Sequence, residues 1–326
     1  DAQCGDELAM RMDLFESFVL QTKNIDIVSD GDLDGIVATG LLVRHLTREG
    51  CTCTWEFPHP KTLRGMTIEG AIIVELPLSK GVRYEGSNLL IDHHGGMPHV
   101  QLYDGQTMVR AVSVPGARSA TDVVLYLLET DSTLPAEAAR IVECVSDVEQ
   151  GVYRSEMCKN LHRYYHLNIE CASMREQLVK LICADKWSEI NEIADSAAEE
   201  WKEVERITHR LVDGARPLVD GTFYFTYHIG TIEQIAMREA MLQLEDRVAI
   251  VVAFGVDDDG YALRATLGTK QDAMDLTPVY KALRKVSGIT SGGRQHVGGA
   301  QFPDGTTLNA ATTWIMKALQ GLASGA

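Results

Sequence analysis

The sequence contains no C-x-x-C pair, no run of 18 apolar residues and no basic N-terminal stretch followed by an apolar one. Its seven cysteines, an odd number, are scattered along the chain, which favours reduced thiols in a cytosolic protein over a disulfide framework. The other two absences give no sign of a membrane-spanning helix or a secretory signal. We therefore expect a cytoplasmic protein with no membrane partner.

Basic residues are also scarce. The chain has 30 Lys and Arg against 46 Asp and Glu, which gives a formal net charge of -16 at pH 7. This charge repels a nucleic-acid backbone and makes a long duplex an unfavourable partner. A short phosphorylated ligand is compatible with it, because divalent cations bound to carboxylates invert the local potential. With 45% hydrophobic and 23% charged residues, the remaining composition is that of an ordinary globular chain.

Apolar runs of strand length alternate with helical patterns in the first half of the chain. The runs cover residues 52–57, 70–76 and 87–92. Such alternation predicts βαβ units and a mainly parallel sheet. Residues 168–213 are predicted to form long acidic helices, and two alternating runs around the turn at residues 258–260 predict a β-hairpin.

The change of character near residue 215 predicts two domains. We expect an α/β fold in which the first domain, residues 1–200, holds the parallel sheet and the acidic connecting helices. A second, smaller α/β domain is expected over residues 215–326. At 326 residues the chain is long enough for each domain to bury its own core, and we expect a cleft between them.

The first candidate motif places Asp30, Asp32 and Asp34 between a predicted strand and a predicted helix. Carboxylates at every second position, with glycines between them, are typical of a site for a hard cation. The alternative is a helix N-cap with a solvated acidic turn. A calcium-binding EF-hand loop is excluded, because Leu41 stands where its last ligand, a glutamate, would be.

The second candidate motif is Asp92-His93-His94, directly after an apolar strand. The carboxyl ends of parallel strands are where α/β sheets place their ligands. Imidazole and carboxylate together suit manganese, zinc or iron better than calcium. A buried histidine satisfied within the core is the alternative, and the pairing of two histidines after a strand end makes it less favourable.

The third candidate motif is a glycine-rich segment, residues 291–300. Gly292 and Gly293 would let backbone N–H groups approach a phosphate, and Arg294 and His296 would add a planar cation and an imidazole. A plain turn is the alternative for this segment.

Together, the order D-x-D-x-D-G, then D-H-H, then a distant glycine pair resembles the DHH phosphoesterase superfamily with its DHH-associated C-terminal domain. RecJ-type exonucleases and the group of nanoRNases, pAp phosphatases and cyclic-dinucleotide phosphodiesterases are most similar to this pattern. The resemblance covers roughly residues 24–305. It implies a DHH catalytic domain over residues 1–200 and a DHH-associated substrate-binding domain over residues 215–326.

The resemblance also implies roles for individual residues. Glu75 takes the place of a strand-end acid that is usually Asp, and Asp147 matches the acid of the fourth motif. Asp30 stands where many relatives have a histidine ligand, and Arg294 stands where they have a phosphate-contacting histidine. The implied metal ligands are Asp30, Asp32, Asp34, Glu75, His93 and Asp147; Asp92 and His94 are the implied catalytic residues, and the implied substrate contacts are Arg118, Gly292, Gly293, Arg294 and His296.

The implied function is hydrolysis of phosphodiester or phosphomonoester bonds in short oligonucleotides, pAp or cyclic dinucleotides. Two Mn2+ ions, with Mg2+ or Co2+ as substitutes, would activate the attacking water. The expected partner is a short oligonucleotide or nucleotide, and a homodimer is compatible with the pattern. Two alternatives stay open: a RecJ-like 5'-3' exonuclease on single strands, and a scaffold whose departures at Val28, Asp30 and Glu75 mark weakened metal binding.

Overall fold

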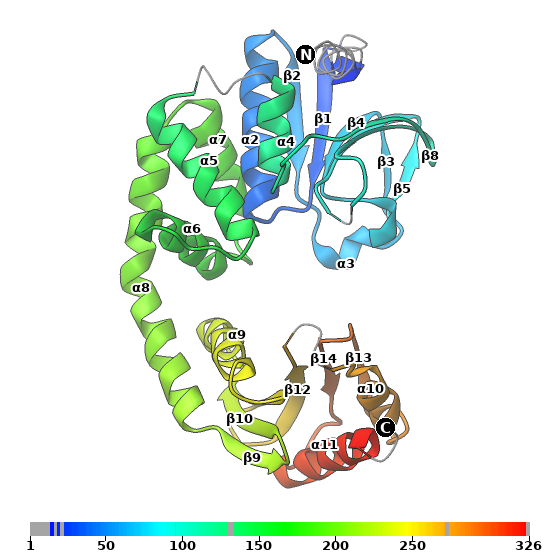
Figure 1. The fold of residues 1–326 in the computed structure, drawn as a ribbon, viewed down its shortest axis with the longest axis vertical. Helices are drawn as coiled ribbons and strands as arrows, with labels where there is room; N and C mark the ends of the chain where they lie inside the picture. Colours follow the sequence, from blue (N-terminus) through cyan, green and yellow to red (C-terminus); the bar gives the residue numbers. More distant parts are fainter. Residues whose placement is uncertain are drawn as a thin grey trace. The chain divides into compact units, whose positions relative to one another are not determined.

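A computed structural model of the chain describes residues 14–15, 18–19, 23–94, 96–128, 134–270 and 274–323 (Figure 1). The chain divides into two compact units, Asp1–Ala198 and Glu199–Ala326. None of the helices in these described ranges is both long enough and apolar enough to cross a membrane.

The first unit is built on a six-stranded sheet of order β2-β1-β4-β6-β7-β8. The first four of these strands run parallel, which confirms the predicted parallel sheet, and the last two add an antiparallel edge. A small parallel pair, β3 and β5, lies beside it. The strands are β1 (Asn24–Ser29), β2 (Thr52–Glu56), β3 (Thr67–Glu69), β4 (Ala71–Val74), β5 (Arg83–Glu85), β6 (Ser87–Ile91), β7 (Val100–Asp104) and β8 (Thr107–Val112).

Helix α2 (Leu33–Arg48) is the central helix of this unit, and it is buried along most of its length. It packs against the sheet and against helices α4 and α7, so that one apolar core joins all of them. Gly40 permits this packing, because a Cβ atom there would stand 2.7 Å from Ile182 of α7. The other helices are α3 (Pro60–Leu63), the 3-10 turn η1 (Leu78–Lys80), α4 (Ala120–Leu128), α5 (Ala136–Glu149), α6 (Glu156–Leu167) and α7 (Ala172–Cys183). Helix α8 (Trp187–Asp213) begins in this unit and continues past Ala198 into the second.

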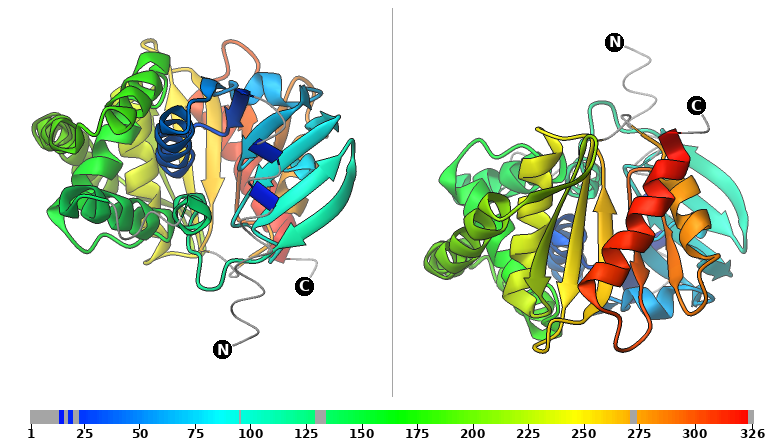
Figure 2. Two further views of the ribbon diagram at one scale, coloured as in Figure 1. Left: turned by 90° about the horizontal axis from the view of Figure 1, so that it is seen from above. Right: turned by 90° about the horizontal axis from the view of Figure 1, so that it is seen from below.

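The second unit has its own six-stranded sheet, of order β13-β14-β12-β11-β10-β9. Strands β11 and β12 form the predicted hairpin, and Gly260 adopts the left-handed backbone that its turn requires. Helices α10 and α11 share one apolar core with this sheet (Figure 2). The elements are β9 (Arg216–Val219), β10 (Thr222–His228), α9 (Thr231–Glu245), β11 (Ile250–Val256), β12 (Ala262–Gly268), α10 (Thr277–Leu283), β13 (Thr290–Gly293), β14 (Val297–Gln301) and α11 (Leu308–Ala323).

The predicted α/β class is therefore confirmed. A sheet with four parallel strands and an antiparallel edge forms the first unit together with its helices, and a second mixed sheet of six strands forms the second.

Candidate metal centre

Three adjacent parallel strands of the first unit end at acidic residues. Asp30 follows β1, Glu75 follows β4 and Asp92 follows β6. Hydrogen bonds continue the sheet beyond the strand ends, from Asp30 N–H to the Val74 carbonyl (3.1 Å) and from Glu75 N–H to the Ile91 carbonyl (2.9 Å). The two acidic motifs of the sequence are therefore brought to the same edge of the sheet.

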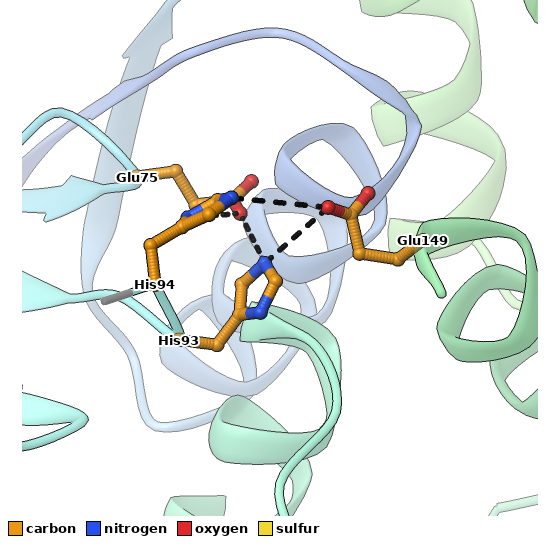
Figure 3. A group of neighbouring side chains, drawn as sticks. All are labelled: Glu75, His93, His94 and Glu149. Atoms are coloured by element: carbon orange, nitrogen blue, oxygen red, sulfur yellow. Dashed lines mark ion pairs between the residues drawn. The ribbon is translucent and has the colours of Figure 1, made fainter. Parts of the chain in front are cut away.

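Four side chains converge at this edge: Glu75, His93, His94 and Glu149 (Figure 3). Each offers one ligand atom, and these atoms all lie within 4.8 Å of one another. Nε2 of His93 is 3.0 Å from Oε1 of Glu75 and 3.5 Å from Oε1 of Glu149. Nε2 of His94 is 3.9 Å from the same Glu149 oxygen. We call these four residues the metal-ligand group.

Asp34 lies next to this group and is held by a helix N-terminus. Its two carboxylate oxygens accept N–H groups of Ala120 (2.6 Å) and Thr121 (2.8 Å), the first residues of α4. Nε2 of His93 is 3.7 Å from Oδ2 of Asp34. Burial and the charge of Asp32 raise the pKa of Asp34 to about 7, against the opposing effect of the helix N–H groups.

Asp32 is the N-cap of α2, as the alternative interpretation of this motif predicted. Its Oδ1 accepts the N–H of Gly35 at 2.8 Å. Its pKa is nevertheless raised, first by burial and then by the negative charges of Glu149 and Asp30. The cap does not exclude Asp32 as a metal ligand, because its carboxylate is still close enough to Glu149 and Asp30 to feel their charges.

Glu75 gives the clearest indication that a cation belongs here. The residue is 1% exposed, and neither of its carboxylate oxygens has a hydrogen-bond partner. Its backbone adopts φ 60, a left-handed conformation that costs a non-glycine residue roughly 1 to 3 kcal/mol. Burial and the charges of Asp32, Asp34 and Glu149 raise its pKa well above the usual range. A buried carboxylate in this setting needs a proton or a cation.

The residues present fit a divalent cation. Nε2 of His93 is buried without a hydrogen-bond partner, like the Glu75 oxygens beside it. Gly35 leaves room for the Glu75 carboxylate, since a Cβ atom at this position would stand 2.5 Å from Oγ of Ser29 and 3.3 Å from Oε2 of Glu75. Carboxylate and imidazole donors together suit manganese, zinc or iron.

Asp92 and His94 are joined to each other. Oδ1 of Asp92 is 2.9 Å from Nδ1 of His94 and accepts the His94 backbone N–H at 3.1 Å. Burial opposes ionisation of Asp92, but the hydrogen bonds from His94 outweigh it and lower the pKa of Asp92. The same bond raises the pKa of His94, whose side chain is 54% exposed. Asp92 thus fixes the orientation of the exposed His94 imidazole within the metal-ligand group.

Four predicted metal ligands lie outside the metal-ligand group: Asp32 and Asp34 lie beside it, whereas Asp30 and Asp147 are bound to basic side chains. Asp30 forms an ion pair with Lys80. Asp147 lies between two arginines, with Oδ1 2.9 Å from Nη1 of Arg118 and Oδ2 3.4 Å from Nε of Arg154. The carboxylate that reaches the group from α5 is that of Glu149, which the sequence analysis did not single out. The sequence feature that could have indicated Glu149 is its position two residues after Asp147, at the acidic end of the same helix.

The predicted substrate residues lie in both units. Arg118, in the first, also contacts Asp122. In the second unit, β13 and β14 pair Gly292 with Gly299 and Gly293 with Gly298. A cavity of about 710 Å³ lies over these strands and β12, and its lining includes Gly292, Gly293 and Arg294. His296 does not line this cavity, and its Nδ1 is buried without a partner. The roles of these residues stay predictions.

No protein-family model matches the sequence, and no curated protein matches it significantly. Solved structures do match the fold. The pGpG-specific phosphodiesterase PggH of Vibrio cholerae has 16% identity and a TM-score of 0.58, and the match covers 91% of this chain and 99% of that one. A manganese-bound exonuclease RecJ has 14% identity and a TM-score of 0.57, over 98% and 95% of the two chains.

A further similar structure is RecJ of Thermus thermophilus in complex with Mn2+, with 15% identity and a TM-score of 0.56. That match covers 96% of this chain but only 55% of the RecJ chain. The protein therefore has the two-domain fold of DHH-superfamily proteins, which confirms at the level of the fold the resemblance found in its motifs.

Proposed function

We propose that this protein is a manganese-dependent phosphoesterase that hydrolyses short oligonucleotides, pAp or cyclic dinucleotides. The observation that carries the proposal is the buried carboxylate of Glu75, which lies 3.0 Å from Nε2 of His93 while neither group has a hydrogen-bond partner among the described residues. Such an arrangement is stable when a cation joins the two groups. The similarity to phosphodiesterase and exonuclease structures supports a hydrolytic reaction.

The metal would be held by Glu75, His93 and Glu149, with Asp34 and Asp32 beside them. A bound divalent ion supplies an activated water and neutralises the charge that develops on the phosphoryl oxygens. The chain's own residues do the remaining work. The amides of α4 hold Asp34 in place, and the cap to Gly35 holds Asp32. Because both carboxylates are fixed in this way, the centre is organised before substrate arrives.

His94 would hold a proton close to the reacting phosphate. Its Nδ1 faces Asp92, so its Nε2 points away from that partner and lies 3.9 Å from Glu149. The raised pKa of His94 keeps Nε2 protonated over more of the neutral range. That N–H would donate to a phosphoryl oxygen or to the leaving oxygen, while Asp92 keeps the ring in orientation.

The substrate's far phosphate would bind in the second unit. Arg294 and the strand carrying Gly292 and Gly293 line its cavity of about 710 Å³, where a guanidinium and close backbone suit a phosphate. The net charge of -16 supports short substrates over long strands. The match over 99% of a pGpG-specific phosphodiesterase supports the same choice.

The test is hydrolysis with Mn2+ of four substrates: a 5'-phosphorylated dinucleotide, pAp, a cyclic dinucleotide and a long labelled single strand. We expect cleavage of short substrates only, and loss of cleavage in Glu75→Gln, whose side chain has nearly the same shape. Processive shortening of the long strand would instead favour the RecJ-like alternative. No cleavage with any divalent metal would favour the scaffold alternative.

A further inference from the structure

Arg175 of helix α7 reaches across to the loop that carries the first acidic motif. Its Nε donates to the Gly31 carbonyl at 2.7 Å, and its Nη2 donates to the Ile169 carbonyl at 2.8 Å. Gly31 stands between Asp30 and Asp32, and Ile169 lies between helices α6 and α7. One planar guanidinium, whose donors form a rigid fork, therefore ties α7 to the acidic motif.

Gly31 permits this close approach. Its φ of 77° is left-handed, and a Cβ atom at this position would stand 2.9 Å from both Nε of Arg175 and Cβ of Phe57. A glycine in a loop can otherwise adopt many backbone conformations. The hydrogen bond from Arg175 restricts them, and because a peptide group is planar, fixing the Gly31 carbonyl also fixes the orientation of the Asp32 N–H.

The stability of α7 does not explain where Arg175 stands. The residue lies in the first turn of this helix, where the helix dipole disfavours a positive charge. Arg44 provides a comparison, because it is a buried arginine of α2 whose Nε lies 2.7 Å from Oδ1 of Asp185, just beyond the end of α7. Arg44 therefore links α2 to the far end of α7, whereas Arg175 contacts the acidic motif itself.

Tyr165 of α6 indicates that Arg175 and Asp32 are neighbours. Burial first, and then the negative charge of Asp32, raise the pKa of Tyr165 to about 12, and the charge of Arg175 opposes this rise. Both charged groups thus lie close to the same hydroxyl group. The charge of Glu149 in turn contributes to the raised pKa of Asp32. Neighbouring groups therefore connect Arg175, through Asp32, to the metal-ligand group.

We propose that Arg175 is a positioning residue of the metal centre, which holds the Gly31 carbonyl so that the Asp32 carboxylate faces the metal-ligand group before a cation binds. The second bond, to Ile169, fixes the guanidinium itself. A loop that is already ordered loses less conformational entropy when it binds a ligand. This inference rests on the proposed metal-dependent function and adds to it a residue that would contact neither the metal nor the substrate.

The experiment measures the affinity of the full chain for Mn2+. Electron paramagnetic resonance records free Mn2+ during a titration, and thermal denaturation in EDTA records the stability of the metal-free fold. Arg175→Met should bind Mn2+ roughly 10- to 100-fold more weakly, which is the usual effect of removing a group that orients a metal ligand. Arg175→Lys should lie between Arg175→Met and the wild-type protein, because it keeps the charge without the planar fork.

Arg44→Met is the matched control for the loss of an arginine between α2 and α7. It should lower the melting temperature in EDTA and leave the dissociation constant for Mn2+ unchanged. Arg175→Met combined with Asp32→Asn should bind Mn2+ as Asp32→Asn alone does, because Arg175 acts through Asp32. An unchanged dissociation constant in Arg175→Met, an equal loss of affinity in Arg44→Met, or a further loss in the double variant would overturn the inference. Failure of the folded wild-type protein to bind Mn2+ would overturn the proposed function instead.

Discussion

Oε1 of Glu75 lies 3.0 Å from Nε2 of His93, and in the described part of the chain neither atom has a hydrogen-bond partner. Both side chains are buried, at 1% and 8% exposure. A buried carboxylate and imidazole at this distance need a proton or a cation between them, because a buried polar group left unsatisfied costs roughly 1 to 3 kcal/mol. The two groups lie where strands β4 and β6 end, and a cation bound between them would satisfy both.

Removing the Glu75 charge should make the melting temperature of the protein insensitive to Mn2+. We expect Mn2+ to raise the melting temperature of the wild-type protein, because a ligand that binds only the folded state stabilises it. Glu75→Gln should lose this rise and bind Mn2+ at least tenfold more weakly, since an amide oxygen is a poorer ligand for a cation. Thermal denaturation with Mn2+ and with EDTA measures both effects. An equal rise in the variant would show that Glu75 is not a ligand.

The metal-free protein should become less stable as the pH rises. The pKa of Asp34 is raised from 3.8 to about 7, so the folded state binds more protons than the unfolded state between these values. The free energy of unfolding therefore falls through this window, by at most about 1.4 kcal/mol for each pH unit per group. Denaturation in EDTA between pH 4 and 8 tests this.

Asp34→Asn is the matched variant for this pH dependence. Its amide cannot ionise, so the slope of stability against pH should become smaller. Glu75, whose pKa is also raised, would keep part of the slope. An unchanged slope would mean that Asp34 ionises in the folded protein without cost. Mn2+ should reverse the trend in the wild-type protein, because ligands must lose their protons to bind metal.

Much of the centre could be predicted because its residues stand at strand ends. The apolar runs indicated where β1, β4 and β6 stop, and the acids that follow them had to share one edge of a parallel sheet. Strands β7 and β8 were not predicted. Most of β8 is exposed, and Arg110 interrupts its apolar residues, so no continuous apolar run marks it as a strand.

The side-chain partners could not be predicted, because they depend on packing between distant elements. Lys80 is 50 residues from Asp30, and Arg118 is 29 residues from Asp147. Nothing local in the sequence indicates either pair. The choice of Glu149 over Asp147 depends on how the end of α5 is turned toward the sheet, since residues two apart on a helix point in different directions.

Glu149 and Asp147 should differ in their effects on metal binding. Glu149→Gln should weaken Mn2+ binding by tenfold or more, because its carboxylate oxygen lies 3.5 Å from Nε2 of His93 within the metal-ligand group. Asp147→Asn should weaken it much less, because its carboxylate is bound to Arg118 and Arg154. Isothermal titration with Mn2+ compares the two variants. Stronger loss in Asp147→Asn would show that Asp147 leaves its arginines to bind the metal.

Asp92→Asn should change the pH at which the protein works. The hydrogen bond from His94 to Asp92 is the largest cause of the raised pKa of His94, so the variant should lower that pKa. If protonated His94 donates from Nε2, activity falls above its pKa, and the alkaline limb of kcat/KM should shift to lower pH. NMR titration of the imidazole in metal-free protein measures the pKa independently. A lowered pKa with an unshifted alkaline limb would exclude His94 as the proton donor.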